Sequence, residues 1–119
     1  MANQIRMFEV VGQVAGRTCI LVDDMIDTGG TIAKAAEALF EQGADRVIAT
    51  ATHGVLSGGA VDILKNSQIS EVIITNTLPV PQEKRFDKLT VLSIAPLLAR
   101  AINEVFSDGS VTSLFDGQS

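Results

Sequence analysis

The chain has 119 residues, 46% of them hydrophobic and 19% charged, which is typical of one compact domain over 1–119 rather than of a disordered or collagen-like segment. Its formal net charge of −5 and its lack of Trp and Tyr disfavour binding to nucleic acid through phosphate contacts or base stacking. The polar residues 1–7 lack the apolar core of a signal peptide and no apolar run is long enough to span a membrane, so neither export nor membrane insertion is expected.

Short apolar runs predict the strands. Residues 8–14 are expected to form an edge strand, and four β-branched runs follow at 18–22, 46–50, 71–75 and 89–92. The four runs are almost continuously apolar, which is typical of parallel strands that are covered on both faces. The single cysteine, Cys19, lies in the first of them and is expected to be a buried thiol in a reducing compartment, which indicates the cytoplasm.

Helical spacing predicts helices between and after these strands. The first extends from Ile32 to Phe40 and ends at a glycine cap, Gly43. Ser57 is expected to cap a second helix, although residues 57–59 could instead bind an anion at its start. Ser93 precedes a third helix, whose apolar stripe continues to residue 105. The proline-containing connection 76–88 has no apolar stripe and is expected to be a loop or a short irregular turn, and its basic residues Lys84, Arg85 and Lys88 are expected to be solvated.

This alternation of strands and helices is typical of right-handed βαβ units. We therefore predict an α/β fold with three layers, in which helices flank both faces of a mostly parallel sheet.

Residues 20–31 concentrate the candidate chemistry, because a buried strand there leads into carboxylates, then glycines, then a helix. Asp23 and Asp24 can accept hydrogen bonds from the hydroxyls of a sugar diol. The glycines and threonines that open the following helix can bring backbone N–H groups and hydroxyls to a phosphate. Taken singly, these residues also fit a solvated strand end, helix caps and a tight turn. Taken together, they fit the two ends of ribose 5-phosphate.

This segment resembles the phosphoribosyl pyrophosphate (PRPP) motif of the type I phosphoribosyltransferase fold. Residues 51–58, 74–79 and 109–115 are similar to the carboxyl-terminal half of ribose-phosphate pyrophosphokinase, also called PRPP synthetase. The resemblance extends over nearly the whole chain, which would then be about half of a larger enzyme.

The resemblance implies a reaction in which ATP transfers its terminal diphosphate to ribose 5-phosphate with Mg²⁺, giving PRPP and AMP. Asp23 and Asp24 would hold the ribose hydroxyls. The 5-phosphate would be surrounded by Asp27, Thr28, Gly29, Gly30 and Thr31. Most of the ATP site, the metal ligands and a catalytic basic loop belong to an amino-terminal half that this chain lacks. We therefore expect no metal site and no catalytic residue in this chain, and binding of ribose 5-phosphate or PRPP without turnover, whereas the full enzyme would bind ATP and form a homo-oligomer.

Further candidates lie at the ends of the second and third predicted strands. His53, Thr75 and Asn76 are candidates to line the pocket. A catalytic role for His53 is the weaker alternative, because no partner that would tune it is evident. A last segment resembles one implicated in binding regulatory phosphate or ADP, and it comprises Ser110, Val111, Thr112, Ser113, Leu114 and Phe115.

Two alternative functions remain open at this point. A phosphoribosyltransferase would consume PRPP, but it needs a base-recognising hood and a pyrophosphate loop that are not evident here. A non-catalytic regulatory subunit would associate with full-length synthetases and retain the ligand site.

Overall fold

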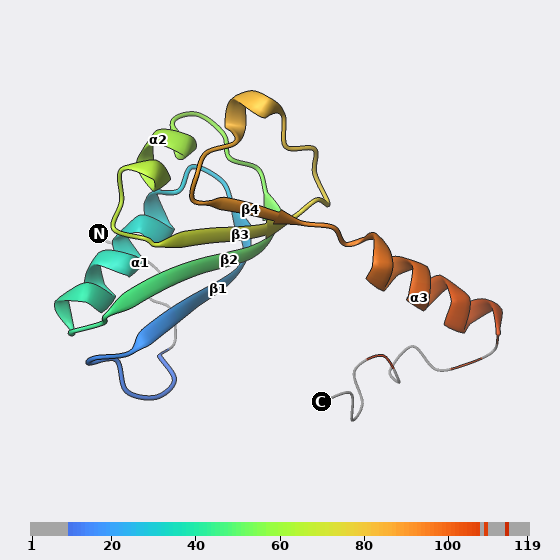
Figure 1. Ribbon diagram of the computed structural model, residues 1–119, viewed down its shortest axis with the longest axis horizontal. Coiled ribbons are helices and arrows are strands. Elements are labelled where there is room, and N and C mark those ends of the chain that lie inside the picture. The colour runs from blue at the N-terminus through green and yellow to red at the C-terminus, as the bar shows by residue number, and fades with distance from the viewer. Residues whose placement is uncertain (1–9, 108, 110–113, 115–119) are drawn as a thin grey trace.

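The computed structural model describes residues 10–107, 109 and 114. Strands and helices alternate along the chain from β1 to α3 (Figure 1). The elements are β1 (Thr18–Ile26), α1 (Gly30–Glu41), β2 (Arg46–Gly54), α2 (Ala60–Lys65), β3 (Glu71–Thr75), the 3₁₀ turn η1 (Gln82–Lys84), β4 (Leu89–Leu92) and α3 (Ala95–Phe106). Among these helices none is long and apolar enough to cross a membrane.

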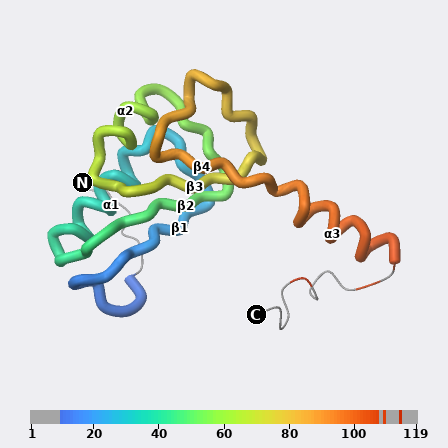
Figure 2. Tube along the Cα trace, in the orientation of Figure 1, coloured from blue at the N-terminus to red at the C-terminus, as the bar shows by residue number. Residues whose placement is uncertain are grey.

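The described strands form one parallel sheet in the order β1-β2-β3-β4. This confirms the predicted α/β class with a parallel sheet and flanking helices. Because all strands run the same way, their carboxyl ends meet at one edge of the sheet (Figures 1 and 2). Ligands of parallel α/β sheets bind at this edge.

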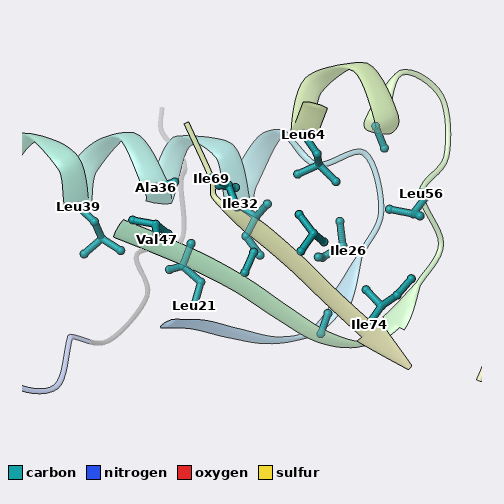
Figure 3. Packing of buried hydrophobic residues seen from close by; sticks show 14 of the residues in the cluster. Leu21, Ile26, Ile32, Ala36, Leu39, Val47, Leu56, Leu64, Ile69 and Ile74 are labelled. Atoms are coloured by element: carbon teal, nitrogen blue, oxygen red, sulfur yellow. The ribbon is translucent and has the colours of Figure 1, made fainter. Parts of the chain in front are cut away.

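The hydrophobic core lies between the sheet and the helices α1 and α2 (Figure 3). Leu21, Val47 and Val72 face it from three adjacent strands, and Ile32 and Leu64 face it from the two helices. Small residues at alternate positions of β2, such as Ala49 and Ala51, let the helices approach closely. No polar or charged side chain is buried among the residues that the structure describes.

Burial along the strands alternates, so the prediction of strands covered on both faces is wrong for the described residues. Leu21 is 4% exposed, whereas its neighbours Ile20 and Val22 are 61% and 70% exposed. The reason is chirality: successive right-handed crossovers that move across the sheet in one direction place α1 and α2 on the same face. Within the described part of the chain the expected third layer is not formed, because α3 has no buried residue and projects away from the sheet (Figures 1 and 2).

Two strands are longer than predicted and one predicted strand is missing. β1 and β2 each continue four residues past their predicted ends, because their ladder extends to Met25 opposite His53 and Ile26 opposite Gly54. The described part of the predicted edge strand, residues 10–14, is not a strand. Gly12 there has a left-handed φ of 90°, which turns the chain out of the extended conformation.

Several local predictions are confirmed. Gly43 has a φ of 98°, and its N–H donates to Phe40 O at 3.0 Å, as expected of a glycine that ends a helix. The connection 76–88 is irregular apart from η1. The prediction of a buried thiol, by contrast, is not met, because Cys19 is only half-buried against the edge of the core.

Gly54 gives the first prediction, because a Cβ atom at this position would overlap Ile74 Cδ1. We expect Gly54→Ala to lower the free energy of unfolding by about 1–3 kcal/mol, measured by urea denaturation. Ile74→Val removes the overlapping methyl group, so the double variant should lose less stability than the two single changes added together. Strict additivity would contradict this account of Gly54.

Candidate functional site

The candidate site begins where β1 leaves its regular alternation. Leu21 and Ile26 are both buried although they are five residues apart, so the period of two is broken between them. Asp23 is half-buried and Asp24 is exposed in this stretch. The N–H of Asp24 donates to Asp23 Oδ1 at 2.8 Å. Both carboxylates therefore remain open to solvent and to a hydroxyl-bearing ligand.

The loop after β1 leads into α1 through a left-handed glycine. Gly29, with a φ of 86°, is the N-cap residue of α1, and no side chain caps that helix end. Asp27, Thr28 and Thr31 around it are exposed. An uncapped helix amino terminus presents unpaired N–H groups and partial positive charge, which together attract an anion. The predicted phosphate-binding residues therefore do lie at an open helix end.

The loop that connects β2 to α2, residues 55–59, packs beside this turn. The N–H groups of Val55 and Leu56 donate to Ile26 O at 2.9 and 3.1 Å, and that of Ser57 donates to Asp27 O at 2.9 Å. The Ser57 hydroxyl donates to Asp27 Oδ1. The prediction that Ser57 caps α2 is wrong, because α2 has Gly59 as its N-cap residue and no side-chain cap.

Each candidate pocket-lining residue is tied by a hydrogen bond to backbone or to another side chain. The ring nitrogen Nδ1 of His53 is 2.7 Å from Thr77 Oγ1. The hydroxyl of Thr75 donates to Thr52 O at 2.7 Å, at the same edge of the sheet. Asn76 Oδ1 accepts the N–H of Ile94 at 2.9 Å, just before α3. These side chains brace the edge of the sheet.

Two lysines that we expected to be solvated instead hold loops in place. Lys84 Nζ donates to Val55 O at 3.1 Å, and Lys88 Nζ donates to Ser67 O at 2.8 Å. Both side chains are half-buried. Hydrophobic periodicity could not predict these two lysine hydrogen bonds, because the loops that they join have no repeating sequence pattern.

The described residues contain no group of three His, Cys, Asp or Glu side chains that could hold a metal ion. Asp23, Asp24 and Asp27 do not form such a group, and we assign no step to Mg²⁺. Of the candidate regulatory segment, Leu114 is half-buried and lines a shallow cavity beside Arg100 and Glu104 of α3. Its other members, Ser110, Val111, Thr112, Ser113 and Phe115, lie outside the described residues.

Comparison with known proteins identifies relatives over nearly the whole sequence. The profile of the phosphoribosyl synthetase-associated domain matches residues 2–116. A ribose-phosphate pyrophosphokinase of Streptomyces coelicolor is 68% identical over 118 residues, which are 99% of this chain and 36% of that relative. A protein of the same name from Mycobacterium tuberculosis is 62% identical over 115 residues, which are 97% of this chain and 35% of that relative.

The fold is also similar to a solved structure. The crystal structure of phosphoribosylpyrophosphate synthetase from Mycobacterium smegmatis matches with a TM-score of 0.77 and 62% identity, over 83% of this chain and 33% of that one. The chain thus spans about a third of the length of these relatives, and the expectation of about half is wrong. Placement of the chain in the carboxyl-terminal half of such an enzyme stays a prediction.

The two glycines at the start of α1 give the second prediction. Gly29→Ala would force a left-handed φ on alanine and place Cβ 3.3 Å from Leu64 Cγ, so we expect a loss of about 1–2 kcal/mol in unfolding free energy. Gly30 has an ordinary φ, and a Cβ atom at this position would have no neighbour within 4 Å, so Gly30→Ala should be neutral or stabilising by up to about 1 kcal/mol. Equal losses in urea denaturation would contradict this assignment.

Proposed function

This chain belongs to the phosphoribosyl synthetase-associated domain family, and on that premise we propose that it is the ribose 5-phosphate-binding part of a ribose-phosphate pyrophosphokinase. That enzyme would transfer the terminal diphosphate of ATP to the anomeric hydroxyl of ribose 5-phosphate, giving PRPP and AMP. The observation that carries the proposal is the juxtaposition of two open carboxylates, Asp23 and Asp24, with the uncapped end of α1 a few residues further on.

The two carboxylates suit the sugar end of the ligand. The 2- and 3-hydroxyls of ribose donate hydrogen bonds, and ionised carboxylates accept them with more than ordinary strength. Asp24 is exposed and Asp23 keeps one oxygen free of the bond from Asp24 N–H. Because neither group is buried, no large desolvation cost opposes their charge before the ligand arrives.

The end of α1 suits the phosphate. Thr28 and Thr31 can add hydroxyl donors to the N–H groups of the first turn. The lysine of the neighbouring loop, Lys84, already donates to the backbone at Val55 O, so we do not assign it to the phosphate. In the proposed complex the phosphate charge is therefore balanced mainly by backbone dipoles and hydroxyl groups.

We propose that turnover requires the remainder of the longer protein, because the chain spans about a third of its relatives. ATP, Mg²⁺ and assembly into a homo-oligomer are then properties of the full-length enzyme, in the cytoplasm. Catalysis of diphosphate transfer depends on preorganised charge around the transferring group. The relatives' name favours a synthetase over a phosphoribosyltransferase.

The third prediction concerns ligand binding. Titration calorimetry should show that the wild-type chain binds ribose 5-phosphate. Asp23→Ala with Asp24→Ala should weaken binding at least about tenfold, because two charge-assisted acceptors of the diol are lost. Mixing the chain with ATP, Mg²⁺ and ribose 5-phosphate should give no PRPP.

The control for this prediction removes two acids from elsewhere. Glu41→Ala with Asp45→Ala deletes the same charge from exposed positions near the amino end of β2, the opposite edge of the sheet, and should leave affinity unchanged. A wild-type chain that does not respond to ribose 5-phosphate would defeat the proposed function. So would equal affinity in the Asp23, Asp24 double variant.

A further inference from the structure

Ser57 is held in place by backbone contacts that do not use its side chain. Its N–H donates to Asp27 O at 2.9 Å, and the two preceding N–H groups, of Val55 and Leu56, both donate to Ile26 O. Lys84 Nζ adds a further bond to this loop, at Val55 O. Removal of the Ser57 hydroxyl should therefore leave the loop itself in place.

The residue before Ser57 has an unusual backbone conformation that the core holds in place. Leu56 has a left-handed φ of 52°, which is rare for a residue with a branched side chain, and it is only 1% exposed. Such a conformation persists where its surroundings determine it, and here the buried Leu56 side chain anchors it in the core. The residue that follows, Ser57, donates its hydroxyl to Asp27 Oδ1.

Without this bond, the Asp27 carboxylate has a competing set of donors. Aspartate side chains readily accept from backbone N–H groups two or three residues further along the chain. For Asp27 these are the N–H groups of Gly29 and Gly30, at the start of α1. That helix end has no side-chain cap in the structure. A carboxylate placed there would both occupy the N–H groups and repel a phosphate.

We infer that Ser57 is a positioning residue, which holds the Asp27 carboxylate away from the amino terminus of α1 and so keeps that end open for the phosphate of the substrate. The inference rests on the proposed function. It assigns different tasks to the two parts of Asp27: its backbone shapes the loop, and its carboxylate is restrained. A purely structural brace would instead affect stability and leave phosphate affinity unchanged.

The test compares ribose 5-phosphate affinity by titration calorimetry in a set of variants. Ser57→Ala should weaken binding about tenfold, the order of magnitude of one charge-assisted hydrogen bond. Adding Asp27→Ala to Ser57→Ala should restore affinity to within about threefold of wild type, because no side chain then competes for the N–H groups at the start of α1 or repels the phosphate. Ser57→Thr keeps the hydroxyl and should stay close to wild type.

A matched control and a ligand-free readout separate positioning from general damage. Ser67→Ala removes a serine hydroxyl bonded to Leu64 O at the far end of α2 and should leave affinity unchanged. In two-dimensional ¹H–¹⁵N NMR spectra without ligand, the amide signals of Gly29 and Gly30 should shift in Ser57→Ala. They should return toward wild-type positions when Asp27→Ala is added.

The outcomes distinguish the two claims. If wild type binds ribose 5-phosphate but Ser57→Ala binds equally well, or the added Asp27→Ala gives no recovery, the positioning role is overturned. Unchanged amide signals in Ser57→Ala would also overturn it. A wild-type chain with no affinity would overturn the proposed function, and the phosphate part of this inference with it.

Discussion

The parallel ladder between β1 and β2 is the constraint on which the site depends. It runs from Thr18 opposite Arg46 to Ile26 opposite Gly54, and then passes into loop contacts in which Ile26 O and Asp27 O accept N–H groups from residues 55–57. Two turns that are about 30 residues apart in sequence therefore emerge side by side from one sheet edge. The turn from β1 carries the acids and leads into α1. The turn from β2 supplies the serine that restrains one of those acids.

The proposed substrate has two ends with opposite requirements, and the local backbone separates them. A diol is bound by acceptors, whereas a phosphate is bound by donors and positive potential. Three aspartates within five residues would oppose the phosphate if all of their carboxylates faced it. In the structure Asp23 and Asp24 belong to the last part of β1, while the carboxylate of Asp27 is paired with Ser57. The N–H groups in the first turn of α1 therefore have no side-chain cap.

Sequence patterns predicted the elements of the fold well, because strand and helix periodicities are local properties. The four β-branched runs, the α1 stripe ending at Gly43 and the irregular connection 76–88 are all present. Patterns could not predict how far β1 and β2 extend, because their last residues depend on pairing with each other across 28 positions. They also placed Ser57 at a helix cap, since sequence shows the spacing to α2 but not the proximity of Asp27.

The misjudged burial of the strands has the same origin. A continuous apolar run such as residues 19–22 shows that both faces of a strand carry apolar side chains, but it does not show what covers them. Handedness sends α1 and α2 to one face, so Leu21 is buried and Ile20 and Val22 are left exposed. The apolar stripe of α3 is likewise exposed, with Ile102 at 57% and Val105 at 65%. The described residues thus carry more apolar surface than α1 and α2 cover. The edge that holds the candidate site, by contrast, is already braced by backbone and side-chain hydrogen bonds, such as those at Ser57 and Thr75. Packing on the open face and construction of the site are therefore separate requirements, and binding at the sheet edge can be tested on this chain directly.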